Sequence, residues 1–231
     1  NSVVVYEMIM LNTGSAYTTC QQIEGYLAWK WGLQSALPTS HLYYSLPPRG
    51  MVVINPFSPI AIAGNFLWLD AMDVNNGSAQ PSSGANIATW YDKSGKGLNA
   101  VQYGTASSYG TYSPTGFNGK PSINITPSSI ATIIGYNVPI STTIFNNGAA
   151  STGFSIFIVY NYSGSNYNYG ALYSIGYSNL PDPIDIYSTN RPNTIGITGT
   201  FINVTTYTTP TLFSSTCDAT SNGIYSEWFN G

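Results

Sequence analysis

The sequence is poor in charge. Only 6% of its 231 residues are Asp, Glu, Lys or Arg, and the formal net charge is −3, whereas an ordinary soluble protein carries about 25% charged residues. A chain with so few cations has no basic field to attract phosphates, so nucleic acid is not expected as a partner. The surface must meet water through hydroxyl, amide and backbone groups. This composition favours an extracellular or virion-surface protein, or a subunit whose surface is largely buried in an assembly.

Histidine and cysteine are also scarce. His41 is the only histidine, and it lies in a segment rich in Pro and Ser. We expect it to be a linker residue without a metal site, because no second histidine or thiol lies nearby. A Ser-His-Asp or Cys-His arrangement therefore lacks a credible base. Cys20 and Cys217 are the only cysteines, and they could form one disulfide or remain two packed thiols.

The few carboxylates do not form a recognisable catalytic pair. A glycosidase needs two carboxyl groups across a cleft, and β-sandwich glucanases usually carry theirs in a Glu-x-Asp-x-x-Glu arrangement on one strand. This sequence contains no such run, and its nearest approach, Asp182-Pro-Ile-Asp185, has the proline and spacing of a turn. A glycine-rich phosphate loop is also absent. We predict that the protein is not an enzyme.

Long apolar runs are missing too. No run approaches the roughly 18 residues needed to span a bilayer, so membrane insertion is not expected. The apolar fraction of 43%, with 14% aromatic residues, is nevertheless ample for a packed core.

The first 33 residues predict a strand followed by a short amphipathic helix. Residues 2–11 are β-rich and end at a polar turn, and we expect a helix over 19–32 with Thr18 or Thr19 as its N-cap. Gly32 is suited to the C-cap. Two adjoining apolar faces follow from the helical period. The first comprises Cys20, Ile23, Leu27 and Trp31, and the second comprises Tyr26, Trp29 and Leu33.

The remainder of the chain predicts an all-β domain. Residues 34–59 are rich in Pro and Ser and are expected to form an extended linker. From residue 60 onward, short β-rich segments alternate with turn residues, which is typical of an antiparallel sandwich or jelly roll. The expected strands lie within residues 66–71, 88–92, 97–103, 121–126, 154–162, 169–177, 195–207, 211–217 and 224–230.

Tyrosines cluster around one predicted hairpin. A type II′ turn at Gly164-Ser165 would place Tyr162 opposite Tyr167 and Tyr160 opposite Tyr169, with all four rings on one face. Such a face could be an internal aromatic ladder, or it could be a contact surface for sugar rings or a neighbouring subunit. The sequence leaves both interpretations open.

Three aspartates and four glycosylation sequons complete the candidate sites. Asp70, Asp73 and Asp92 could supply oxygen ligands to Ca²⁺, although turn capping is the favoured interpretation; no other cofactor is expected. The Asn-x-Ser/Thr pattern permits N-glycosylation at Asn76, Asn124, Asn161 and Asn203.

Residues 66–125 resemble the opening of a laminin-G-like, concanavalin A-type lectin/glucanase domain, of the kind repeated in large DNA viruses and some phages. The matching pieces are FLWLDAMD, with its Trp-Leu-Asp-Ala, the WYDKSG turn, and the NGKP approach to a strand. FSIFIVY and the run from Cys217 to the end resemble its later strands. The resemblance implies a concanavalin A-like sandwich over 60–231 and, for most such modules, a non-catalytic carbohydrate-binding or surface-structural function.

The resemblance also suggests a function for residues 1–33. A strand and helix of this kind close one repeat and lead into the next, so we expect this segment to close a preceding or neighbouring repeat. An alternative is that it completes its own sandwich, because the strand that should return after Asn230-Gly231 is absent from the sequence. The helix would then contribute inter-repeat packing residues, namely Ile23, Leu27, Trp29 and Trp31.

These expectations give a predicted function. The protein is predicted to be a structural or adhesive repeat of a virion surface or extracellular filament, with other copies of itself as partners and residues 2–11 as an added strand. The alternative prediction is a lectin module that stacks glycans on exposed tyrosines.

Overall fold

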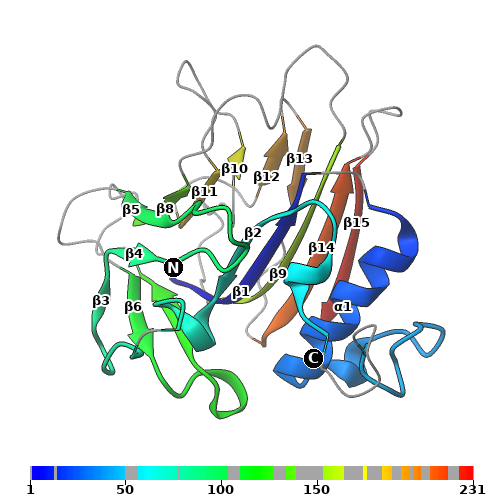
Figure 1. The fold of residues 1–231 in the computed structure, drawn as a ribbon, viewed down its shortest axis with the longest axis horizontal. Helices are drawn as coiled ribbons and strands as arrows, with labels where there is room; N and C mark the ends of the chain where they lie inside the picture. The colour runs from blue at the N-terminus through cyan, green and yellow to red at the C-terminus, as the bar shows by residue number, and fades with distance from the viewer. Residues whose placement is uncertain are drawn as a thin grey trace.

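A computed structural model gives the fold of the chain (Figure 1). It describes residues 2–12, 15–49, 57–77, 79–103, 110–126, 134–138, 153–163, 174–175, 184–188, 194–197, 200–203, 209–217 and 224–230. Most elements are strands, nearly all of them paired antiparallel, and among these residues there is one α-helix with a few short 3₁₀ helices, which confirms the all-β prediction.

The strands form two sheets. The larger, eight-stranded sheet has the order β15-β14-β9-β1-β7-β6-β3, with β2 also paired to β1. Its strands are β1 (Ser2–Leu11), β2 (Asn65–Asp70), β3 (Asn86–Ile87), β6 (Gly110–Ser113), β7 (Ser122–Ile125), β9 (Phe154–Ser163), β14 (Thr211–Cys217) and β15 (Ile224–Asn230). The smaller, seven-stranded sheet has the order β13-β12-β10-β11-β8-β5-β4. Its strands are β4 (Thr89–Trp90), β5 (Ala100–Tyr103), β8 (Ile134–Val138), β10 (Ser174–Ile175), β11 (Ile184–Ser188), β12 (Thr194–Ile197) and β13 (Thr200–Asn203).

Each predicted β-segment contains a strand, but four further strands were not predicted, namely β3, β6, β8 and β11. The error at β11 has a specific cause: Asp182-Pro-Ile-Asp185 suggested a turn, yet Asp185 pairs with Ser174 on one side and Asn137 on the other. A proline near the start of a strand is compatible with sheet pairing, because its missing N–H then costs little.

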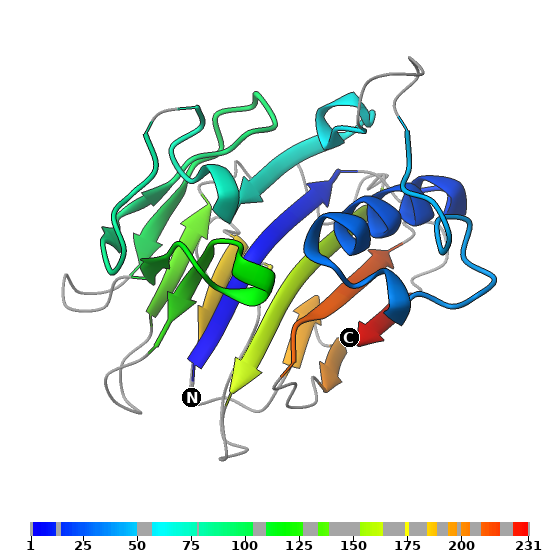
Figure 2. The ribbon, with the colours of Figure 1, turned by 90° about the horizontal axis from the view of Figure 1, so that it is seen from below.

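Strand β1 lies in the middle of the larger sheet. One edge pairs antiparallel with β9 from Ser2 to Leu11, while the other edge pairs with β7 near Val3–Val5 and with β2 from Glu7 onward. The predicted strand at 2–11 is therefore confirmed. The expectation that residues 1–33 close a preceding or neighbouring repeat is wrong for this structure, because β1 completes the sheet of its own chain (Figure 2).

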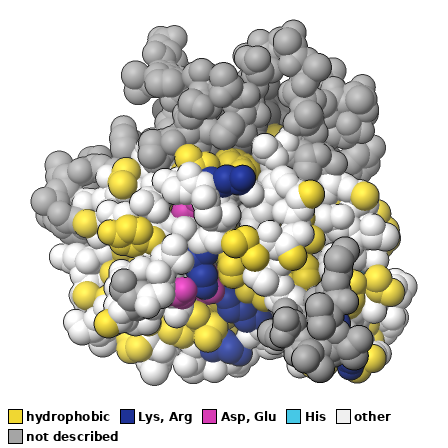
Figure 3. All heavy atoms as spheres, viewed as in Figure 1, with side chains coloured by type: hydrophobic (Ala, Val, Ile, Leu, Met, Phe, Trp, Pro, Cys, Tyr) yellow, Lys and Arg dark blue, Asp and Glu magenta, His cyan; other side chains and the backbone are white. Residues whose placement is uncertain are grey.

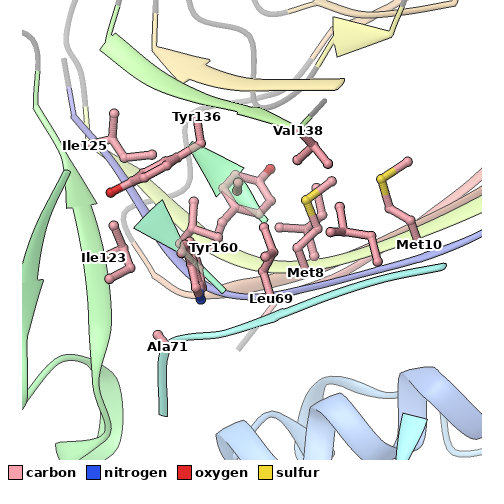
Figure 4. Close-up of a cluster of buried hydrophobic side chains, with 14 of the residues drawn as sticks. Met8, Met10, Leu69, Ala71, Ile123, Ile125, Tyr136, Val138 and Tyr160 are labelled. Atoms are coloured by element: carbon pink, nitrogen blue, oxygen red, sulfur yellow. The ribbon is translucent and has the colours of Figure 1, made fainter. Parts of the chain in front are cut away.

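The core between the two sheets is apolar and well filled. Met8 and Met10 of β1 point toward Tyr136 and Val138 of β8, and Leu69 of β2 joins the same cluster (Figure 4). All five side chains are fully buried. Trp90 packs edge-on against Tyr136 at 6.1 Å between ring centroids. The contacts of β1 and β2 with β8 hold the smaller sheet against the larger one, and the Trp90–Tyr136 contact lies within the smaller sheet.

Helix α1 (Tyr17–Trp31) covers the outer face of the larger sheet (Figure 2). It ends at Gly32 with a φ of 78°, as predicted. Its start differs from the prediction: the N-cap is Ala16, without a side-chain hydrogen bond, and Thr18 and Thr19 lie inside the first turn. The carbonyl of Ala16 instead accepts the backbone N–H groups of Thr19 and Cys20.

The predicted first face of the helix is buried, but within its own chain. Ile23, Leu27 and Trp31 are fully buried in a second apolar cluster with residues of β1, β9 and β14, and Cys20 packs at its border. Full burial of one such side chain contributes about 1.5–3 kcal/mol, so this face is enough to fix the helix on the sheet. The expected inter-repeat packing by these residues is therefore replaced by packing on the chain's own sheet.

Residues 37–49, which we call the strap, fold back over the helix and are not an extended linker. The predicted linker begins with the short 3₁₀ helix η1 (Gln34–Ala36), and Leu37 and His41 of the strap are buried. Trp29, the fourth expected packing residue, is half-buried and its indole N–H donates to the Tyr43 carbonyl at 2.8 Å. The strap thus gives the helix a second covering layer.

The contact between strap and helix predicts an unusual response at Gly25. A Cβ added there would lie 2.6 Å from the Cβ of Tyr43, whereas helix propensity alone favours Ala over Gly by about 1 kcal/mol. We expect Gly25→Ala to lower the free energy of unfolding measured by urea denaturation. In a Tyr43→Gly background the same substitution should raise it. A stabilising effect of Gly25→Ala in the otherwise unchanged protein would show that the strap does not pack on the helix.

Candidate functional site

A carboxylate lies in the centre of the larger sheet. Glu7 is fully buried in β1, directly opposite Asp70 of β2. The pairing of β1 with β9 shifts register between Val5 and Glu7, as in a β-bulge, and this irregularity lets both Tyr6 and Glu7 face the helix. An ionised group in this position needs several donors to replace water.

Three neutral donors reach the Glu7 carboxylate. The indole N–H of Trp31 donates to Oε2 at 2.6 Å, and the indole N–H of Trp68 donates to Oε1 at 2.8 Å. The hydroxyl of Tyr26 donates to Oε1 at 3.0 Å. These donors come from the helix and from β2, so the carboxylate ties both elements to β1.

Two lysines complete what we call the charge network, which consists of Glu7, Lys30, Asp70, Asp73 and Lys93. Lys30 Nζ lies 2.8 Å from Glu7 Oε2 and 2.8 Å from Asp70 Oδ2. Lys93 Nζ lies 3.1 Å from the same Asp70 oxygen and 3.0 Å from Asp73 Oδ2. In the view of Figure 3, several dark blue and magenta side chains gather near the middle of the face, and a few others lie apart from them.

Aromatic rings line the two cations. Lys30 Nζ lies 5.4 Å from the ring centroid of Tyr26 and 5.5 Å from that of Trp31. Lys93 Nζ lies 4.5 Å from the ring centroid of Trp68. Each ring presents its negative face to an ammonium group, which offsets part of the cost of removing that group from water.

Burial and charge act in opposite directions on this network. Burial raises the pKa of Glu7, and the nearby Asp70 raises it further, against the opposing effect of Lys30. Burial alone would lower the pKa of Lys30, but the Glu7 and Asp70 carboxylates outweigh it and raise that pKa. Burial, with the charges of Glu7 and Asp70, raises the pKa of Tyr26. Burial therefore favours the protonated form of Glu7, while the two carboxylates favour the charged form of Lys30 and the neutral form of Tyr26.

A second buried polar group joins three elements. Ser214 of β14 donates to Glu24 Oε1 of the helix at 2.6 Å, and His41 Nε2 of the strap lies 3.2 Å from Glu24 Oε2. The backbone N–H of Tyr43 donates to His41 Nδ1 at 3.1 Å. His41 is therefore a buried connecting residue, and its interpretation as a linker residue is wrong. Since Glu24 lies between the serine and the imidazole, the group does not have the order of a hydrolytic triad.

The three aspartates proposed as calcium ligands accept backbone N–H groups, and Asp70 and Asp73 also bind lysines. Asp92 accepts the backbone N–H groups of Trp68, Ser94 and Leu98. Asp70 Oδ1 accepts the Met72 N–H. Partial burial of Asp73 is outweighed by the Gly77 N–H and by Lys93, which hold the pKa of Asp73 below its ordinary value. These contacts are those of turn-capping residues. In the part of the chain with described side chains, no group of three or more His, Cys, Asp or Glu could hold a metal ion.

The predicted tyrosine face is not formed at Tyr160. This side chain is buried in the core, and its residue pairs with Val5 of β1 on one side and Thr211 of β14 on the other. Both edges of β9 are therefore occupied there, so Tyr169 cannot be the partner of Tyr160 and the ring is not available to a glycan. The side chains of Tyr162, Tyr167 and Tyr169 lie outside the described part of the structure.

The sequons differ in accessibility. Asn76 is exposed in a turn, with a positive φ of 51°. Asn124 and Asn161 are half-buried in β7 and β9, and the amide oxygen of Asn124 accepts the Ser122 hydroxyl. The side chain of Asn203 is not described. Among the three sequon side chains that are described, Asn76 is therefore the most exposed, and its amide nitrogen donates to the Asp92 carbonyl at 3.3 Å.

Cys20 carries a thiol in the structure, which is one of the two states that the sequence left open. Its Sγ lies 3.4 Å from the hydroxyl of Thr216 in β14. The side chain of Cys217 is outside the described residues.

The grouping of Asp70 with Glu7, Lys30 and Lys93 was not predicted from the sequence, and neither was the contact of Glu24 with His41. One signal was present: Glu7 interrupts an otherwise apolar strand, VVVYEMIML. A lone charge within a buried strand requires a compensating partner, but the sequence does not show which cation supplies it.

Replacing Trp31 by Phe should cost more stability than replacing Trp90 by Phe. Both indoles are fully buried, but Trp31 donates to a carboxylate, whereas Trp90 donates to the Asp70 carbonyl at 3.2 Å. Loss of a hydrogen bond to a charged group costs about 1.5–3 kcal/mol, against about 1 kcal/mol for a neutral one. Urea unfolding of both variants measures the difference, and equal costs would contradict an ionised Glu7.

The buried phenols predict loss of stability at alkaline pH. Burial raises the pKa of Tyr6 to about 12 and also raises those of Tyr26 and Tyr136. The folded-state values lie above the ordinary tyrosine value of about 10, so the unfolded chain releases these protons first. The stabilisation is complete below about pH 10 and is lost as the pH rises through the folded-state values.

We therefore expect cooperative alkaline unfolding, followed by tyrosinate absorbance and tryptophan fluorescence. Tyr6→Phe should make the fall in stability with pH less steep. Tyr17→Phe is the matched control, because the Tyr17 side chain is 68% exposed, and it should leave the slope unchanged. Ionisation of every tyrosine near pH 10 in a still-folded protein would contradict the prediction.

No family model matches the chain, and neither a curated protein nor a solved structure matches it. The laminin-G-like resemblance therefore stays a prediction.

Proposed function

We propose that the protein is a non-enzymatic structural or adhesive module of a virion surface or extracellular filament, with a concanavalin A-like sandwich as its fold. One observation carries the proposal: each carboxylate whose side chain is described is engaged by donors of its own chain. Glu7, Asp70 and Asp73 bind lysines, Glu24 binds Ser214 and His41, and Asp92 binds backbone N–H groups. A glycosidase needs carboxyl groups that face a substrate and a water.

The proposed partners are other copies of the chain. The strap exposes Leu42 and Leu46 by 62% and 63%, and in a chain with 6% charged residues such side chains favour association over solvation. Strand addition by residues 2–11 is not the proposed route, because β1 already pairs on both edges within its own chain. Contact through the strap surface leaves the sheet intact.

The experiment is sedimentation velocity over a wide concentration range, with electron microscopy of the largest species. We expect concentration-dependent self-association that Leu42→Ser/Leu46→Ser weakens at least about tenfold, which corresponds to about 1.4 kcal/mol. Met72→Ser is the matched control, because Met72 is 41% exposed on η3 (Ala71–Asp73), outside the strap.

Two other outcomes would replace the proposal. A monomer at every concentration that binds a glycan array would favour the lectin alternative, although the burial of Tyr160 already removes one of its four tyrosines. Hydrolysis of a β-glucan by the purified chain would identify an enzyme instead.

A further inference from the structure

We propose that Lys30 and Asp70 become joined by an intramolecular amide bond, formed within the charge network with Glu7 as the proton carrier. The inference is independent of the proposed function, because self-association and the cross-link are measured separately. It rests on the placement of a lysine amine between two buried carboxylates.

The reacting groups are already in contact through a carboxylate oxygen. Lys30 Nζ lies 2.8 Å from Asp70 Oδ2, which is one bond from the carbon that the amine would attack. The Lys30 side chain is 17% exposed and the Asp70 side chain is 4% exposed. Groups held in this way react as if at an effective concentration of about 10⁵–10⁸ M, provided that the bound geometry is close to that of attack.

Glu7 is positioned to move the proton. Its Oε2 lies 2.8 Å from Lys30 Nζ, and its side chain is not exposed to solvent. Burial raises the pKa of Glu7, which favours acceptance of a proton, while the two carboxylates raise the pKa of Lys30 and make release of its proton the costly part of the step. The two indole N–H groups and the Tyr26 hydroxyl hold the carboxylate in place while it accepts and returns that proton.

The electrophile also has its own supporting donors. Lys93 Nζ contacts Asp70 Oδ2 at 3.1 Å, and the Met72 N–H donates to Oδ1 at 3.0 Å. Both donors stabilise the negative charge that develops on the oxygens when the amine adds to the carboxyl carbon. The aromatic rings over the two lysines keep water from competing with the amine.

The step is balanced without a further reactant. Lys30 gives one proton to Glu7, and the neutral amine forms an N–C bond to the Asp70 carboxyl carbon. One C–O bond of Asp70 breaks, and its oxygen leaves as water with the proton from Glu7 and a second proton from the amine. An ammonium and a carboxylate become an amide and water, and Glu7 returns to its ionised form. The reaction replaces two buried charges by a neutral group, which removes their desolvation cost.

Mass spectrometry of the denatured, previously folded 231-residue chain tests the proposal. We expect the intact mass to be lower than the sequence mass by one water. Trypsin cannot cleave after an acylated lysine, so digestion should give residues 1–49 joined to residues 50–93, with cleavage after Lys93 retained. A bond to Glu7 would leave 1–49 unlinked, and a bond from Lys93 would block cleavage at that residue; either result overturns the assignment.

Variants separate the three roles. Lys30→Arg keeps the charge but cannot form the amide, and Glu7→Gln keeps the size but cannot carry the proton; both should show the full sequence mass. Asp70→Asn should form the same link with loss of ammonia in place of water. Asp73→Asn is the matched control and should retain the link. A folded unaltered chain with the full sequence mass would overturn the proposal whatever the variants do, and efficient cross-linking in folded Glu7→Gln would overturn the role of Glu7.

Discussion

The burial of one ionised carboxylate in the central strand constrains most of the structure. Glu7 lies in a strand paired on both edges and covered on both faces, so water cannot satisfy it. An unpaired charge there would cost several kcal/mol. The chain supplies two indoles, a phenol and an ammonium instead. Because three of these donors come from helix α1, the charge fixes both the rotation and the position of the helix on the sheet.

The need to compensate buried carboxylates is met with only a few cations. Lys30 serves Glu7 and Asp70 together, and Lys93 serves Asp70 and Asp73. Glu24, on the opposite side of the helix contact, joins β14 to the strap through Ser214 and His41. The helix is thus held by two buried polar anchors and one apolar face between them. Hydrophobic burial supplies most of the free energy, while the directional hydrogen bonds select a single arrangement.

Local features of the fold could be predicted from the sequence, and non-local ones could not. The strand at 2–11, the helix end at Gly32 and the buried face of Ile23, Leu27 and Trp31 follow from residue periodicity and capping. What that face packs against depends on contacts across the chain, so the sequence did not decide between the chain's own sheet and a neighbouring one.

His41 was misjudged for the same reason. Composition marks a Pro- and Ser-rich segment as a linker, but a contact with Glu24, which is distant in sequence, brings that segment inward. The candidate site was only partly predicted, because Asp70 was proposed as a calcium ligand and the two lysines that bind it were not proposed as site residues.

The position of β1 also decides how copies of the chain could associate. Exchange of β1 between copies would separate Glu7 from Trp68 and from Lys30 at the moment of opening. It would also break the pairing with β9 along the whole of β1. An edge strand has no such cost, since one of its sides is unpaired. Association that leaves Glu7 in place must therefore use surfaces outside the central strands, and the strap, anchored by Glu24 but exposing Leu42 and Leu46, is such a surface.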